Sequence, residues 1–248
     1  MFSNQAFFIF ATMAQKKLIR FAAIKAFYNV LEYPAGMQGK WNLHFNNPNN
    51  IVLELACGRG EYTVGLAALY PSVNFIGVDI KGNRMYIGAK KCLENKLTNA
   101  AFLRTQITML PNYFKAQEVK DIWITFPDPQ LRGSKAKKRL THPYFLALYL
   151  QIIHPNGCIH LKTDSPKLYA FTKKVIELYQ LNLVEDYDNV YEQTNSNTLN
   201  IKTHYESLDI ANSKRVFYIQ FCFNNKINFN DDEKLALLKV FEASLPLT

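Results

Sequence analysis

Residues 51–60 read IVLELACGRG, an apolar run that passes into a turn with two glycines. The β-rich part predicts a strand over Ile51–Ala56, and the pattern after the turn predicts a helix over Glu61–Leu69. Gly58 and Gly60 let the chain turn sharply and let a ligand come close to the backbone. A strand, a glycine turn and a helix in this order are typical of an α/β sheet.

From this turn onward, short β-rich runs alternate with helical patterns, as in a parallel sheet with crossover helices. After Tyr179, two β-rich runs with no helical period between them predict an antiparallel pair. The sequence therefore predicts an α/β fold with a Rossmann-like, doubly wound, mostly parallel sheet and an antiparallel C-terminal hairpin. Further strands are expected at Val73–Asp79, Ala101–Arg104, Asp121–Phe126, Gly157–Thr163, Leu181–Val190 and Val216–Phe223, and further helices at Asn83–Asn95, Pro143–Ile153, Pro166–Tyr179 and Asp231–Leu245.

The composition favours a globular protein with a polyanionic partner or an acidic surface to bind. Of the 248 residues, 48% are hydrophobic and 20% are charged. No apolar run reaches the roughly 18 residues that a membrane span needs, so no membrane partner is expected. Lys and Arg number 29 against 20 Asp and Glu, which leaves a net charge of +9.

The four cysteines, Cys57, Cys92, Cys158 and Cys222, are far apart in the sequence and form no C-x-x-C motif. This spacing favours neither a zinc site nor a disulfide framework, so we expect reduced thiols in a cytoplasmic protein. The five histidines form no pair at ligand spacing, and no metal site is predicted.

Four acidic residues lie at or near the carboxyl ends of predicted strands: Glu54, Asp79, Asp128 and Asp164. Ligands of open parallel sheets bind at this edge. Each acid alone is readily explained as a helix cap or turn former, and it is their coincidence at one edge that indicates a site. Asp79 lies 21 residues after Gly58, where an acid accepts hydrogen bonds from ribose hydroxyls, so a nucleoside-containing cofactor is expected.

Two residues favour S-adenosyl-L-methionine over NAD as this cofactor. Glu54 would repel a pyrophosphate, whereas it could pair with the cationic amino acid end of S-adenosylmethionine. A dinucleotide fingerprint also needs a small residue at position 63, where this chain has Thr63. An NAD-linked oxidoreductase is therefore the weaker alternative.

The fourth predicted strand runs into Phe126-Pro-Asp-Pro129, which is followed by five cations between Arg132 and Arg139. The two prolines restrict the backbone around Asp128, and the cations that follow would attract phosphates. A charge run is usually a solvated face, but this one leaves the expected ligand-binding edge. The arrangement indicates a rigid acidic loop beside a nucleic-acid surface.

With these motifs the sequence resembles the bacterial single-chain tRNA (guanine-N7-)-methyltransferases, the TrmB family, over about residues 16–223. The resemblance rests on L-E-L-A-C-G-R-G, G-V-D-I-K, F-P-D-P followed by K-K-R-L-T, L-K-T-D after the fifth strand, and T-H-Y-E at 203–206. It implies the class I S-adenosylmethionine-dependent methyltransferase fold and methyl transfer to N7 of a guanosine in the variable loop of tRNA. Expected segments are 1–248 as one domain, with 1–12 an extension from a misassigned start, 13–50 a basic N-terminal segment, 51–223 the catalytic core and 231–245 a C-terminal helix.

The resemblance also implies roles for individual residues. Asp128 corresponds to the acid at the cofactor and target base and is the candidate catalytic residue. Gln130 and Arg132 stand where the family commonly has Trp and Lys; Arg132 keeps the positive charge for substrate binding, while Gln130 removes any stacking at its position. The implied cofactor-binding residues are Glu54, Gly58, Gly60, Asp79, Gln106 and Asp128, and the implied substrate-binding residues are Arg132, Asp164, Thr203 and Glu206.

Two further readings remain open. An amino-group methyltransferase acting on adenine in RNA or DNA could use a D-P turn, but such enzymes usually show N-P-P-Y or D-P-P-Y, and Phe126-Pro-Asp-Pro129 lacks the aromatic residue after the second Pro. A non-catalytic RNA-binding protein of the same fold would have lost Glu54, Asp79 or the glycines, which are all present. The protein is expected to act as a monomer or homodimer.

Overall fold

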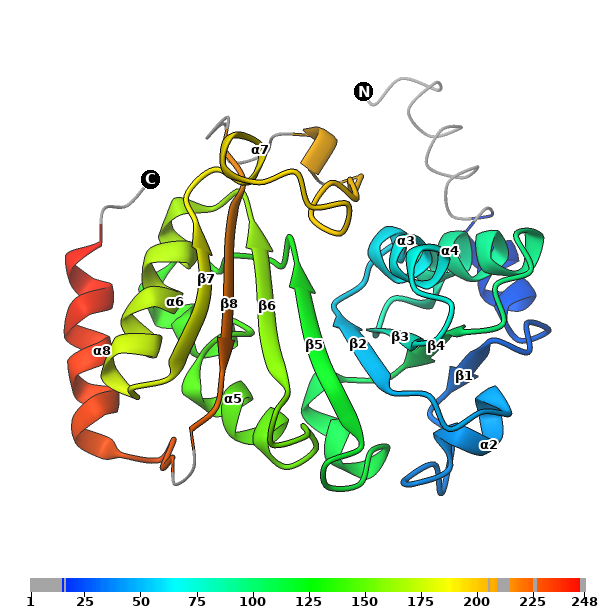
Figure 1. The fold of residues 1–248 in the computed structure, drawn as a ribbon, viewed down its shortest axis with the longest axis horizontal. Coiled ribbons are helices and arrows are strands. Elements are labelled where there is room, and N and C mark those ends of the chain that lie inside the picture. Colours follow the sequence, from blue (N-terminus) through cyan, green and yellow to red (C-terminus); the bar gives the residue numbers. More distant parts are fainter. Residues whose placement is uncertain (1–14, 16, 205, 209–214, 225–226, 246–248) are drawn as a thin grey trace, which may run out of the picture.

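The computed structural model describes residues 15, 17–204, 206–208, 215–224 and 227–245. Eight strands form one sheet in the order β1-β4-β3-β2-β5-β6-β8-β7 (Figure 1). The expected extension over 1–12 lies outside the described residues. The five predicted parallel strands form the middle of the sheet as β2 to β6, which confirms the doubly wound topology.

The central parallel strands β2 to β6 are largely buried on both faces, as expected for strands covered by crossover helices. Every residue of β2, β3 and β6 is buried. The parallel strands are β1 (Val30–Glu32), β2 (Ile51–Leu55), β3 (Asn74–Asp79), β4 (Ala100–Arg104), β5 (Val119–Thr125) and β6 (Cys158–Thr163).

Helices cover the two faces of the sheet with separate apolar cores. On one face, side chains of α3 (Glu61–Leu69) and α4 (Gly82–Glu94) pack with Trp123 of β5. On the other face, α5 (Pro143–Leu150) and α6 (Pro166–Leu178) cover the sheet, with α8 (Asp232–Ser244) beside α6 (Figure 1). The shorter helical elements are α2 (Trp41–Phe45), η1 (Ile107–Asn112), η2 (Gly133–Lys138), α7 (Val190–Gln193) and η3 (Glu206–Leu208).

The helix starts follow from local sequence. Proline stands at the first position of α5 and α6, where a missing N–H breaks no helical hydrogen bond. The Asp231 side chain accepts a hydrogen bond from the backbone N–H of Lys234 and caps α8.

The N-terminal segment contributes more structure than the sequence predicts. β1 extends the sheet by pairing in parallel with β4, and α2 places Trp41 in the core. A three-residue strand is too short to show a period of two, which explains why it escapes detection. Within the described residues, no helix combines the length and apolar character that a membrane crossing requires.

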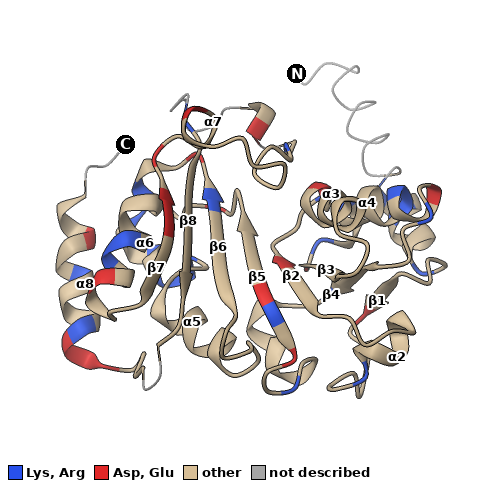
Figure 2. Cartoon of the chain, viewed as in Figure 1, with Lys and Arg blue, Asp and Glu red and all other residues tan. Residues whose placement is uncertain are grey.

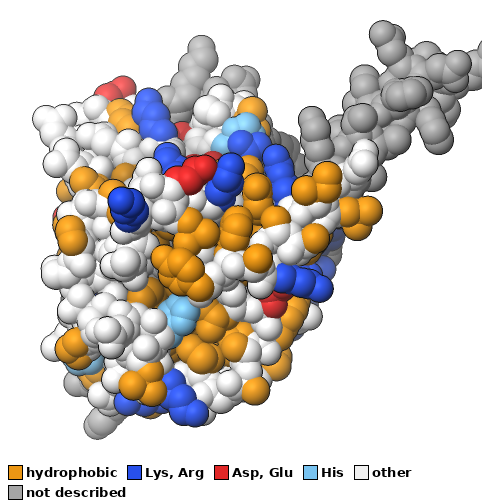
Figure 3. Space-filling view, turned by 90° about the vertical axis from the view of Figure 1, so that its right-hand side faces the viewer, with side chains coloured by type: hydrophobic (Ala, Val, Ile, Leu, Met, Phe, Trp, Pro, Cys, Tyr) orange, Lys and Arg blue, Asp and Glu red, His pale blue; other side chains and the backbone are white. Residues whose placement is uncertain are grey.

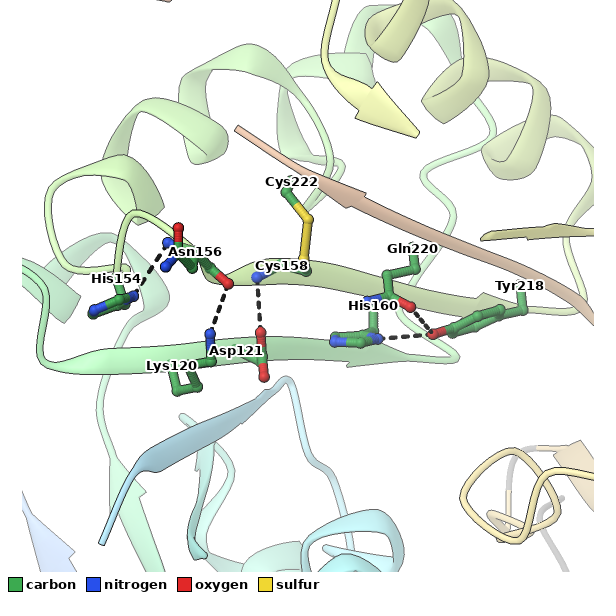
Figure 4. The surroundings of a disulfide bond; sticks show 9 residues. All are labelled: Lys120, Asp121, His154, Asn156, Cys158, His160, Tyr218, Gln220 and Cys222. Carbon is green, nitrogen blue, oxygen red and sulfur yellow. Dashed lines mark hydrogen bonds between the residues drawn. A yellow bond between two sulfur atoms is a disulfide. The ribbon is translucent and has the colours of Figure 1, made fainter. Parts of the chain in front are cut away.

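The predicted antiparallel hairpin is present, but it brings two cysteines together against expectation. β8 (Phe217–Cys222) pairs antiparallel with both β6 and β7 (Asn182–Tyr187). Cys158 therefore lies directly opposite Cys222, with 4.3 Å between the Cα atoms, and the two form a disulfide (Figure 4). The expectation of four reduced thiols is wrong in this structure, because 64 residues separate a pair that only the sheet register brings together. Cys57 and Cys92 are buried free thiols.

Candidate active site

A cavity of about 1000 Å³ lies at the carboxyl edge of the parallel sheet. The loops after β2, β3, β4, β5 and β6 all contribute to its wall. The structure thus brings together five of the predicted site residues from five separate segments: Gly58, Asp79, Gln106, Asp128 and Asp164. This is the strand edge at which a doubly wound sheet binds its ligands.

Two of these loops leave their strands through strained backbone. Ala56 follows β2 at a φ of 54°, and Phe126 follows β5 at a φ of 45°. Both residues line the cavity, and neither is a glycine. Such conformations cost on the order of 1–3 kcal/mol each and persist where the surrounding structure holds them, most often at functional sites.

Backbone amides hold the Asp79 carboxylate in the wall. Its Oδ2 accepts a hydrogen bond from the Gly58 N–H at 2.9 Å, and its Oδ1 accepts one from the Lys81 N–H at 2.8 Å. These donors leave the remaining lone pairs of both oxygens for a ligand. The glycine turn and the predicted ribose-binding acid are therefore one unit.

Glu54 lies behind this wall and outside the cavity lining. Its Oε2 accepts hydrogen bonds from the Thr63 N–H at 2.8 Å and the Thr63 hydroxyl at 2.6 Å, and its Oε1 accepts one from the Thr125 hydroxyl at 2.8 Å. Burial raises the pKa of Glu54 to about 7, although these hydrogen bonds favour its charged form. Glu54 fastens the start of α3 to β2 and β5, and its predicted contact with the cofactor stays a prediction.

Gly60 also acts through packing and is not part of the wall. It lies at a φ of 71°, and a Cβ atom there would come within 2.4 Å of Cε1 of Phe102. No other residue type fits this place without moving that ring.

The Phe-Pro-Asp-Pro loop after β5 brings Asp128 into the cavity wall, and β2 lies between β5 and the strand that ends at Asp79. Asp128 is exposed, and its Oδ1 accepts a hydrogen bond from the Gln130 N–H at 3.0 Å. Gln130 has a φ of 48°, so the loop bends back around the carboxylate. Next to it, Asp164 enters the wall with Ser165, whose hydroxyl caps α6 by accepting from the Leu168 N–H at 3.2 Å.

Comparison with known proteins shows which family this chain resembles. A family model described as a putative methyltransferase matches residues 48–219. A tRNA (guanine-N(7)-)-methyltransferase from Bacteroides thetaiotaomicron is 44% identical over 219 residues, which cover 84% of this chain and 86% of the relative. One from Porphyromonas gingivalis is also 44% identical, over 211 residues that cover 80% of this chain and 86% of the relative.

The chain belongs to the tRNA (guanine-N7-)-methyltransferase family. As a member of this family it is an enzyme that takes its methyl group from S-adenosylmethionine. Solved structures agree at the level of the fold. A 16S rRNA adenine methyltransferase from Catenulisporales acidiphilia superposes with a TM-score of 0.55 at 12% identity, covering 75% of this chain and 93% of that one. The 16S rRNA methyltransferase KamB gives 0.54 at 15% identity, covering 71% and 88%.

The residues of this methyltransferase fit S-adenosylmethionine. Asp79 offers a fixed carboxylate to ribose hydroxyls, and Gln106 offers an amide that can pair with the adenine amino group. Between them, Thr105 lines the cavity with a buried hydroxyl that has no hydrogen-bond partner among the described residues. An unsatisfied buried hydroxyl is costly unless a ligand supplies the partner.

The structure does not bring Thr203 and Glu206 to the cavity wall. Glu206 instead forms an ion pair with Lys162 of β6 at 3.2 Å and accepts a hydrogen bond from the Tyr191 hydroxyl. The Thr203 hydroxyl accepts a hydrogen bond from the Glu206 N–H at 3.1 Å. These two residues form a separate cluster, which adjoins the cavity because Lys162 also lies 5.5 Å from the ring of Phe126 in the wall.

Lys162 is a residue that sequence reasoning missed. Most of the sheet carries no charge (Figure 2), yet this lysine side chain is fully buried in β6. Its Nζ also donates to the carbonyls of Leu199 at 2.7 Å and Ile201 at 3.0 Å. Burial lowers the pKa of Lys162, and Glu206 acts in the opposite direction. A lysine between Leu161 and Thr163, inside a strand predicted to lie within the sheet, was the signal that could have found it.

The basic segment after the Asp128 loop is divided between solvent and core. Arg132 is exposed but is not part of the cavity wall, and Lys135, Lys137 and Lys138 are exposed in η2. Arg139 is fully buried, so its interpretation as one of the phosphate-attracting cations is wrong. Among the described residues, no group of three metal-binding side chains is found.

Proposed function

We propose that this enzyme transfers the methyl group of S-adenosylmethionine to N7 of a guanosine in the variable loop of tRNA. The observation that carries the proposal is that Asp79 and Asp128 line one cavity, on the loops after β3 and β5, the two strands on either side of β2. One side suits a nucleoside cofactor, and the other side offers a carboxylate to an acceptor base. The names of the relatives support the choice of base and of RNA.

The cofactor supplies an electrophilic methyl group when it is bound. Asp79 would bind the ribose hydroxyls, Gln106 would contact the adenine, and the Gly58 backbone would allow close approach, because all three line the cavity. Asp128 lines the same cavity, so these residues would hold the cofactor near it. Holding two reactants in the correct orientation can lower the activation free energy by on the order of 7–11 kcal/mol.

Asp128 serves the reaction through its charge. Guanine N7 carries a lone pair and no proton, so the attack needs no general base. The methylated purine becomes cationic, and a carboxylate beside it stabilises the charge as it develops. Glu206 is engaged by Lys162 and Tyr191, which leaves Asp128 as the better placed acid.

The tRNA is held by surfaces on both sides of the cavity. Arg132 and the exposed lysines of η2 meet its phosphates next to Asp128, and Asp164, Thr203 and Glu206 contribute to the substrate side. The β1 side of the molecule carries Lys and Arg among hydrophobic side chains, with few acidic ones (Figure 3). Such a mixture suits an RNA backbone and its unstacked bases.

We also propose a domain organisation, an oligomeric state and a cellular location for this enzyme. Residues 1–248 act as one methyltransferase unit, and the enzyme works as a monomer or homodimer. It acts in the cytoplasm, where its tRNA substrate is found.

The test uses two transcripts of one tRNA, made with guanosine or with 7-deazaguanosine. Both are incubated with methyl-labelled S-adenosylmethionine and enzyme, and the digested nucleosides are identified by mass spectrometry. We expect label in 7-methylguanosine from the first transcript and none from the second, whose N7 is replaced by carbon. Label on adenosine would favour an adenine methyltransferase, and absence of label despite cofactor binding would favour a binding protein.

A further inference from the structure

The side chain of Arg139 grips the loop that presents Asp128. Its Nε donates to the Pro129 carbonyl at 3.0 Å, and its Nη2 donates to the Gln130 carbonyl at 3.0 Å. These are the two residues that directly follow Asp128. The conformation of the loop therefore depends on a buried cation that lies nine residues after Gln130 in the sequence.

One carboxylate of α8 holds this cation in place. Oε1 of Glu242 accepts from Arg139 Nη2 at 2.8 Å, and Oε2 accepts from Nη1, so the pair is bidentate. Both side chains are almost completely buried, and the guanidinium carbon lies 4.5 Å from the ring centroid of Phe171. The loop carbonyls, the Glu242 carboxylate and the Phe171 ring therefore hold the Arg139 guanidinium in one orientation.

The same carboxylate also contacts the first turn of α6, which follows Asp164. Lys167 Nζ lies 3.4 Å from Oε1 of Glu242, and its side chain is 5% exposed. Lys167 directly follows Pro166, which lines the cavity next to Asp164. Glu242 is thus the shared anion beneath the Asp128 loop and the Asp164 segment.

We propose that Glu242 is a positioning residue for methyl transfer. It fixes Arg139 and Lys167 so that Asp128 and Asp164 keep their spacing across the acceptor side of the cavity. The inference rests on the proposed function, in which Asp128 acts beside the target base. Glu242 does not line the cavity, so its effect belongs to the rate of transfer and not to cofactor binding.

The first test is Glu242→Gln, which keeps the shape of the side chain and removes the charge that two buried cations share. At a temperature where circular dichroism shows a folded protein, we expect kcat to fall 10- to 100-fold while Kd for S-adenosylmethionine changes less than two-fold. Glu233→Gln, at an exposed position of the same helix, is the matched control and should match the unaltered enzyme. A kcat within two-fold of the unaltered enzyme for Glu242→Gln would overturn the proposal.

A second variant separates positioning from stability. Combined Arg139→Met, Lys167→Met and Glu242→Leu replaces the whole network with apolar side chains, a change that often preserves or raises stability. We expect its Tm to match or exceed that of Glu242→Gln while kcat stays low, because the Pro129 and Gln130 carbonyls have lost their donor. Recovery of full kcat would show that the network only stabilises the fold. Both variants are compared with an unaltered enzyme that makes 7-methylguanosine, so a failure of the proposed function appears first in that enzyme.

Discussion

The two sides of the cavity are built by different kinds of interaction. On the cofactor side, Asp79 is held by backbone amides 2 and 21 residues away. On the acceptor side, buried ion pairs connect Arg139 with a residue 103 positions later and Lys162 with one 44 positions later. Asp79 is thus held by backbone amides within one β-α-β unit, whereas the Asp128 loop and Lys162 depend on ion pairs with more distant segments.

The two kinds of interaction suit different tasks, cofactor binding on one side of the cavity and RNA recognition on the other. Amide donors change little between proteins that share a glycine turn, which suits a cofactor that never changes. Ion pairs between distant segments can be rearranged by substitutions in any one of them, which suits a side that must match a particular RNA. Substitutions on the cofactor side should therefore change Kd for the cofactor, and substitutions on the acceptor side should change kcat.

The largest effect is expected for Asp128→Asn. It removes the charge but keeps the shape and the hydrogen bond from Gln130, so kcat should fall about 10²- to 10³-fold, as for loss of one electrostatic stabiliser. Single-turnover rates and filter binding of tRNA measure the two quantities. Binding should weaken by less than the rate falls, and equal losses in both would contradict a catalytic role. Asp232→Asn, at an exposed position of α8, is the control.

Glu54 gives a pH-dependent stability on the cofactor side. Its folded-state pKa of about 7 lies above the ordinary 4.5, so between these values the folded protein keeps a proton that the unfolded chain has lost. The free energy of unfolding should therefore fall as pH rises from about 4.5 to 7, by on the order of 3 kcal/mol from this group.

Urea unfolding of the cofactor-free protein at pH 5 and pH 8 measures this contribution. Glu54→Gln lacks the titrating group, so its stability relative to the unaltered protein should rise by a similar amount between the two pH values. Parallel pH profiles for the two proteins would show that Glu54 does not titrate in this range.

Asp79→Ala tests the cofactor side, where we expect a change in Kd for the cofactor and little change in kcat. It removes the ribose acceptor and leaves the Gly58 and Lys81 amides without their partner, so Kd for S-adenosylhomocysteine should rise about 10- to 100-fold. Titration calorimetry provides the measurement, and kcat at saturating cofactor should change much less. An unchanged Kd would remove Asp79 from the site. Glu94→Gln, on the exposed surface of α4, should bind normally.

The smallest effect is expected at the disulfide. Cys158 lies at the first residue of β6, about 16 Å from the strand end that reaches the cavity, at roughly 3.3 Å per residue. Cys158→Ala should lower Tm by a few degrees and leave kcat within two-fold. Thiol titration of the unfolded protein with and without reductant counts the bridge directly. A large loss of kcat would mean that the far end of the sheet controls the acceptor side.

The sequence predicts the cofactor side better than the acceptor side for the same reason. Gly58 and Asp79 are 21 residues apart, and their contact follows from one β-α-β unit made of β2, α3 and β3. Arg139 in a run of surface lysines carries no local sign of burial, and Glu242 in an amphipathic helix resembles any exposed acid. Cys158 and Cys222 show the same limit, because register in an antiparallel pair depends on the loop between the strands.

The long separation in sequence between Asp128 and Glu242 has a consequence for synthesis on the ribosome. Chains emerge from the N-terminal end, and β2, β3 and β4 with their glycine turn can pair before the later strands exist. The acceptor wall must wait until α8 has emerged and Glu242 can reach Arg139. A nascent chain can therefore have a complete cofactor side before it has a complete acceptor side.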